Sequence, residues 1–120
     1  MGVQYSSAAG YGVVFSEDEL VKFVKDKSIY VQFDPEDCWE CAEAVSREYN
    51  LDLFYAGDSM TGDGLDFLFG TGRKMDEYGS DSAFQFNEIL VASKEDEYAI
   101  QALSEASGKK PAFYAGMHVG

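Results

Sequence analysis

The sequence predicts a single α+β domain, residues 1–120, in which three helices accompany a mainly antiparallel sheet of about five strands. Three observations lead to this prediction. Three segments begin with a helix-capping residue and continue with apolar side chains at helical spacing. The segments between them place apolar side chains at every second position, as half-buried strands do. The length of 120 residues suits one domain of ordinary size.

The three predicted helices are recognised by their terminal residues. The segment SEDELVKFVKDK begins with Ser16, and Glu19 three positions later completes a capping box. The segment DPEDCWECAEAVSREYN begins with Asp34 as its cap, followed by a proline at the first helical position. The segment SKEDEYAIQALSEASG begins with Ser93 and ends at Gly108, a residue type that commonly terminates helices. We therefore expect helices in these three places.

The predicted strands share an alternation of apolar side chains with a period of two. They comprise residues 11–15, 29–33, 51–55, 65–69, 83–92 and 111–119. The connection DSMTGDG between the third and fourth of these is short and turn-rich, so residues 51–69 should form an antiparallel hairpin.

A weak internal similarity appears when the sequence is shifted by 59 positions. Residues 28–57 then align with residues 87–116, and the segment FYAG at 54–57 falls on the same segment at 113–116. One interpretation is two copies of a strand-helix-strand unit, which together would give the ferredoxin-like plan with helices on one face of the sheet. The other is chance convergence of helix-start and strand-end chemistry.

The charge of the chain is strongly and unevenly negative. Twenty-two acids oppose nine Lys and Arg, for a net charge of −13. Between Asp34 and Asp66 the only base is Arg47. Such a field repels nucleic acid and anionic membranes and attracts basic surfaces. A general role in solubility is the alternative interpretation.

A row of carboxylates on the second predicted helix suggests where a basic partner would bind. Glu36, Glu40 and Glu43 are spaced four and three positions apart, so on a helix they would be neighbours about 5 to 6 Å apart. Trp39, at the border of this row, has the character of an interface residue or of a cover over the apolar rim. The predicted contact residues are Glu36, Glu40, Glu43, Trp39, Asp52, Asp58, Asp63 and Asp66. An ordinary solvated face is the alternative.

The pair Cys38 and Cys41 resembles a thioredoxin-like Cys-x-x-Cys site in its expected position between a strand and a helix. The surrounding acids would raise a thiol pKa, and a helix capped by Asp34 would place Cys38 a full turn inside it. With Ala42, Val45 and Tyr49, the two cysteines instead form one apolar stripe. The chain offers only these cysteines and His118 as strong zinc ligands, so we expect no metal site. No serine or cysteine has a local signature that would pair it with His118, and we expect no catalytic residue and no cofactor.

These observations favour a non-enzymatic acidic protein that inhibits or regulates a basic nucleic-acid-binding protein, such as a nuclease, by mimicking nucleic-acid phosphates. In size and charge alone the chain is similar to virus-encoded inhibitors of host defence nucleases, including anti-CRISPR proteins. We expect a cytoplasmic monomer or homodimer, in the host cytoplasm if it is viral, that contacts neither membrane nor nucleic acid directly. The alternatives are a thioredoxin-like redox or ligand-binding protein centred on Cys38 and Cys41, and a self-associating assembly protein.

Overall fold

The computed structural model describes the backbone of residues 5–58, 64–76 and 94–119, and the side chains of residues 9–57, 64–72 and 94–116. The predicted strand at 83–92, the predicted cap Ser93 and the predicted contact residue Asp63 lie outside the described residues.

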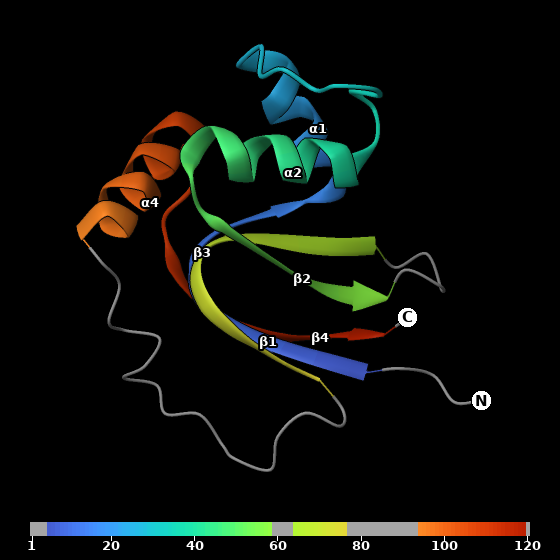
Figure 1. Ribbon diagram of the computed structural model, residues 1–120, viewed down its shortest axis with the longest axis vertical. Coiled ribbons are helices and arrows are strands. Elements are labelled where there is room, and N and C mark those ends of the chain that lie inside the picture. Colours follow the sequence, from blue (N-terminus) through green and yellow to red (C-terminus); the bar gives the residue numbers. More distant parts are fainter. Residues whose placement is uncertain (1–4, 59–63, 77–93, 120) are drawn as a thin grey trace.

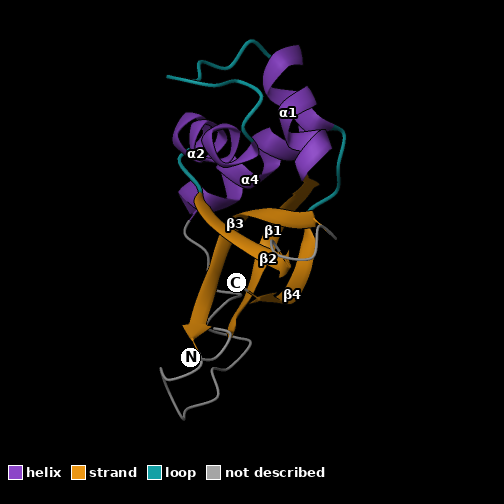
Figure 2. Cartoon of the chain, turned by 90° about the vertical axis from the view of Figure 1, so that its right-hand side faces the viewer, coloured by secondary structure: helices purple, strands orange, loops and turns teal. Residues whose placement is uncertain are grey.

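The fold is α+β, as the sequence predicts. The strands are β1 (Tyr5–Ser16), β2 (Asp52–Asp58), β3 (Gly64–Asp76) and β4 (Ala112–Val119); the helices are α1 (Glu17–Asp26), α2 (Cys38–Tyr49) and α4 (Lys94–Ser107). The three helices gather on one side of the strands, which form a strongly curved layer on the other side (Figure 1, Figure 2).

The four described strands form a sheet in the order β4, β1, β3, β2, and all of these neighbours are antiparallel. The predicted hairpin is confirmed, since β2 and β3 pair from Asp52 opposite Gly70 to Asp58 opposite Gly64. The sheet closes into a barrel because the ends of β2 and β4 pair in parallel, with Gly57 opposite His118.

Closely apposed glycines accommodate the contact between β1 and β3, the two long curved strands. Gly12 lies opposite Gly70. A Cβ atom at Gly12 would lie 2.1 Å from the carbonyl oxygen of Phe69, and one at Gly70 would lie 2.1 Å from that of Tyr11. Because real Cβ atoms do not approach so closely, only glycine permits this approach of the two backbones.

The hydrophobic core lies between the convex face of the sheet and the helices. Alternate residues contribute to it from Tyr11 to Phe15 of β1 and from Leu65 to Phe69 of β3. Among them, Phe15, Phe67 and Phe69 are essentially inaccessible to water. The helices complete this core with Leu20, Val24, Cys41, Val45, Ile100 and Leu103. Burial of these apolar side chains supplies the main stabilisation of the fold.

The predicted helix termini at Ser16 and Gly108 are confirmed, but the predicted strand at 29–33 is wrong. The capping box between Ser16 and Glu19 is present, and Gly108 follows α4 with a φ of 73°. Beyond α1, the N–H of Ile29 donates to the carbonyl of Val24, while Ser28 adopts a left-handed conformation. This is a Schellman motif, so Ile29 packs on the core as part of a helix cap.

The second helix begins later than the sequence predicts. Its cap is Asp37, whose side chain accepts a hydrogen bond from the N–H of Trp39, and Cys38 is the first helical residue. Asp34 instead forms a separate turn, in which its side chain accepts from the N–H of Glu36. The proposed repeat over residues 28–57 therefore lacks its first strand, and β1 is the strand that precedes this helical segment.

Candidate functional site

The three glutamates predicted to line one helix face have different environments. Glu36 precedes α2 and forms an ion pair with Lys25 of α1. The Oε2 atom of Glu40 accepts a hydrogen bond of 2.8 Å from the N–H of Asp34, so this carboxylate stabilises the turn before the helix. Only Glu43 remains as predicted, fully on the exposed face of α2. The predicted row of three is therefore wrong, because the helix starts at Cys38.

Three of the predicted contact residues are exposed acids available for an external partner. The side chains of Glu43, Asp52 and Asp66 are exposed, and none of these side chains makes a hydrogen bond or ion pair within the described part of the chain. Asp58 ends β2, and its side chain lies outside the described set. No charged side chain is buried among the residues whose side chains are described. The charged side chains in this described set therefore all contribute to the surface potential.

Trp39 covers the edge of the core while keeping part of its ring in water. Its ring meets that of Tyr55 edge-on at 4.9 Å between centroids, and that of Phe67 edge-on at 5.2 Å. The side chain is still 38% exposed. Edge-to-face packing of this kind stabilises the fold, so Trp39 has a structural role whether or not a partner also contacts it.

The two cysteines lie in the first turn of α2, closer to the helix start than the sequence predicts, yet their environment disfavours a thiolate. Burial, followed by the nearby Glu17 carboxylate, raises the pKa of the Cys38 thiol to about 11. Burial and the acids around the turn also raise the pKa of Cys41. Cys41 is inaccessible to water, and its thiol donates to the carbonyl oxygen of Pro35 at 3.2 Å. These are properties of structural cysteines, and the predicted apolar stripe is confirmed.

A small cleft that the sequence did not predict lies on the opposite face of the sheet from the helices. Val14, Phe54 and Leu68 line it, and each alternates along its strand with residues that pack into the core. Asp66 and Tyr114 also line this cleft, which has a volume of about 100 Å³. We call it the sheet cleft. Its full lining is Val14, Phe54, Tyr55, Ala56, Asp66, Leu68, Tyr114, Ala115 and Gly116.

The register of the β2–β3 hairpin defines the floor of the sheet cleft. Phe54 lies opposite Leu68, and Ala56 lies opposite Asp66. Asp52 shares this face of the hairpin by strand alternation, but it is separated from Asp66 by about four residues along the strands, or roughly 13 Å. The floor is therefore apolar at its centre, with one carboxylate within the cleft and a second carboxylate some distance away.

Both copies of the FYAG segment contribute to the sheet cleft. The first copy supplies Phe54, Tyr55 and Ala56 from β2, and the second supplies residues 114–116 from β4. A Cβ atom on Gly116 would lie 2.6 Å from the Cβ of Ala56, so the small residues of the two segments meet closely. The repeated segment was a signal in the sequence, but only the pairing of β2 with β4 shows that the two copies meet.

No protein-family model, curated protein or solved structure matches this chain. Among the residues that the structure describes, no three His, Cys, Asp or Glu side chains are grouped so as to hold a metal ion. None of the described helices has the length and apolar character needed to cross a membrane.

Proposed function

We propose that this chain is a non-enzymatic acidic protein that inhibits or regulates a basic nucleic-acid-binding protein by occupying the groove that normally holds phosphates. The observation that carries the proposal is an excess of carboxylates without a counter-charge. Nine basic side chains can neutralise at most nine of the 22 acids one to one, so 13 acids remain. Wherever these side chains are described, they lie at the surface.

The exposed acids would attract a basic partner at long range and would also contact it directly at defined positions. A net charge of −13 accelerates encounter with a basic surface, and this acceleration falls as salt screens the charges. Glu43, Asp52 and Asp66 are the strongest contact candidates, because they can bind a partner without first breaking an ion pair within the described chain. Glu36 and Glu40 would have to exchange internal partners.

The proposed class of partner is indicated by the groups that line phosphate-binding grooves. Such grooves present Arg, Lys and backbone N–H groups to regularly spaced anions, and a carboxylate can accept the same hydrogen bonds. A nuclease or similar enzyme whose groove is occupied in this way loses access to its substrate. An inhibitor of host defence nucleases, of the anti-CRISPR kind and acting in the host cytoplasm, fits the small size and high negative charge of this chain.

The test is an affinity capture that compares two variants of equal charge. The test variant carries Glu43→Lys, Asp52→Lys and Asp66→Lys. The control carries Glu48→Lys, Glu97→Lys and Glu105→Lys, three exposed acids outside the predicted contact set. Captured proteins are identified by mass spectrometry, and bound material is challenged with duplex DNA and with increasing salt. Circular dichroism confirms that both variants fold.

We expect the wild type and the control variant to retain a basic nucleic-acid-binding protein, and duplex DNA and salt to release it. The test variant should lose at least nine-tenths of the captured protein. Equal loss from both variants would mean that net charge alone attracts the partner, and this would contradict a defined site. Capture that duplex DNA does not reduce would exclude phosphate mimicry.

A further inference from the structure

We propose that the sheet cleft receives one arginine side chain of the basic partner, with Asp66 pairing with the guanidinium and Tyr114 flanking it. This inference rests on the proposed function, because it names the chemical group that the acidic protein takes from its partner. Three observations support the inference: the cleft itself, the carboxylate of Asp66 in its lining, and the exposed aromatic ring of Tyr114.

The volume of the sheet cleft matches a single side chain. Pockets that hold cofactors or drug-sized ligands usually measure roughly 300 to 1,000 Å³. The sheet cleft measures about 100 Å³. A nucleotide or flavin is therefore too large, whereas one extended side chain entering from the surface is of suitable size.

The lining of the cleft matches a side chain that is apolar along its stem and cationic at its end. Val14, Phe54 and Leu68 provide apolar surface for the methylene groups. Asp66 supplies a carboxylate that has no hydrogen-bond or ion-pair partner within the described part of the chain. Long basic side chains bury their stems against apolar surface in this way while their charged ends remain near water or an opposite charge.

Arginine fits these surroundings better than lysine does. A guanidinium can donate two parallel hydrogen bonds to one carboxylate, and its flat face stacks on aromatic rings. The ring of Tyr114 lines the cleft and is 39% exposed, so it is accessible to an incoming cation. A lysine ammonium could pair with Asp66 but would gain less from the ring. Phosphate-binding grooves are rich in arginine, and this agrees with the proposed partner class.

The inference is tested by nuclear magnetic resonance titration of the isotope-labelled protein with a defined probe, N-acetyl-arginine methylamide. The neutral citrulline analogue has nearly the same shape and serves as the matched control ligand. Asp66→Asn removes the cleft carboxylate, and Asp52→Asn makes the same charge change on the same sheet face outside the cleft. Tyr114→Ala removes the ring, whereas Tyr114→Phe keeps it.

We expect the arginine probe to shift the amide signals of Phe54, Ala56, Asp66, Leu68 and residues 114–116. Asp66→Asn and Tyr114→Ala should each weaken binding at least fivefold, while Asp52→Asn and Tyr114→Phe should remain within twofold of the wild type. The citrulline analogue should bind at least fivefold more weakly than the arginine probe. A lysine probe that binds as tightly as the arginine probe would overturn the assignment to arginine.

Three further results would overturn the inference. The first is that the probe shifts amide signals of acids outside the cleft as much as those within it. The second is that Asp52→Asn and Asp66→Asn weaken binding of the arginine probe equally. The third is that the neutral citrulline analogue binds as tightly as the arginine probe. The capture experiment separates this failure from failure of the proposed function. If the probe does not enter the cleft but the wild type still retains a partner that DNA displaces, only the cleft inference fails. If the probe enters the cleft and no basic protein is captured, the proposed function fails.

Discussion

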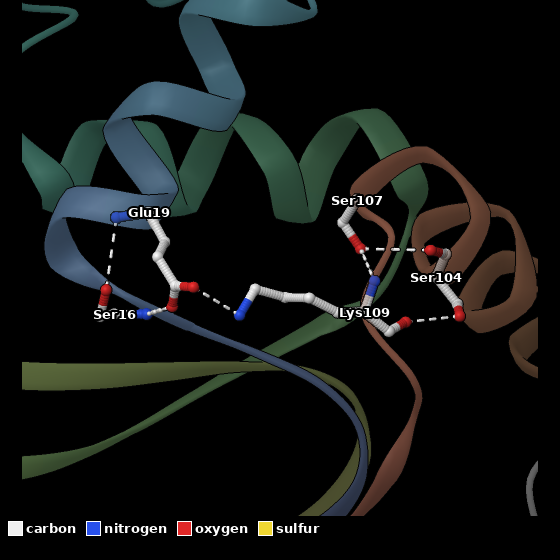
Figure 3. A network of polar contacts seen from close by, with 5 residues as sticks. All are labelled: Ser16, Glu19, Ser104, Ser107 and Lys109. Atoms are coloured by element: carbon white, nitrogen blue, oxygen red, sulfur yellow. Dashed lines mark hydrogen bonds and ion pairs between the residues drawn. The ribbon is translucent and has the colours of Figure 1, made fainter.

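The carboxylate of Glu19 connects two distant parts of the chain, and its removal gives a sharp test of the structure. Its Oε1 atom accepts a hydrogen bond of 2.9 Å from the N–H of Ser16, and its Oε2 atom lies 2.7 Å from the Nζ atom of Lys109. Lys109 is itself held after α4, where its carbonyl accepts from the Ser104 hydroxyl at 2.6 Å. Figure 3 shows this network joining the start of α1 to the end of α4.

The pKa of Glu19 sets an upper limit on the free energy of unfolding that its contacts contribute. The Lys109 ammonium and then the Ser16 N–H lower this pKa from 4.5 to about 2. At about 1.4 kcal/mol for each pKa unit, the full shift would correspond to an upper limit of about 3.5 kcal/mol. The side chain of Glu19 is 50% exposed, so water screens much of this interaction. We therefore expect Glu19→Gln, which keeps an acceptor for Ser16, to cost about 1 kcal/mol at pH 7.

The measurement is urea unfolding of the wild type and Glu19→Gln between pH 7 and pH 2. Because folding lowers the pKa of Glu19, its contribution is fully present above about pH 4.5 and is lost as the pH falls through about 2. The difference in unfolding free energy between the two proteins should therefore shrink steadily over this interval. Other carboxylates titrate equally in both proteins and cancel in the difference.

A double-mutant cycle with Lys109→Met identifies the source of this free energy. The coupling between Glu19 and Lys109 should account for most of the loss at pH 7 and should weaken in high salt. A difference that stays constant from pH 7 to pH 2, or a coupling of zero, would refute the reasoning. Either result would mean that the α1–α4 contact does not depend on this ion pair.

Two further predictions test the sheet contact and the cysteines. Gly12→Ala should lower the free energy of unfolding by about 3 kcal/mol or prevent folding, because the new Cβ would lie 2.1 Å from the Phe69 carbonyl oxygen. Gly108→Ala is the control. Its Cβ would enter open space, so only the backbone strain at positive φ should lower the unfolding free energy, by about 1 kcal/mol. Equal costs would contradict the close approach of β1 and β3. At pH 8 the Cys38 thiol should react with a disulfide reagent about a hundredfold more slowly in the folded protein than in urea, because its pKa rises from 9.0 to about 11. If the Cys38 thiol reacts as fast in the folded protein as in urea, that result would support the alternative of a thioredoxin-like redox protein.

The sequence alone determined the features that depend on contacts between near neighbours. The capping box at Ser16, the helix end at Gly108 and the hairpin over residues 51–69 each depend on residues only a few positions apart. The apolar stripe of the second helix was predictable for the same reason, even though the first residue of that helix was not. The sequence pattern predicted Asp34 as the cap, and the separate turn at residues 34–37, which places the cap at Asp37, explains the error.

The tertiary structure decided which apolar segments join the sheet and which acids remain free. Alternation at residues 29–33 looked like a strand, but both sides of β1 are occupied by β3 and β4, and the loop lies beside the helices, away from the strands (Figure 1). Lys25 reached Glu36 only because α1 and the turn before α2 lie side by side. The sheet cleft exists because β2 and β4, which are far apart in the sequence, meet at the barrel closure. Such pairings depend on chain closure over long separations, which local propensity does not encode.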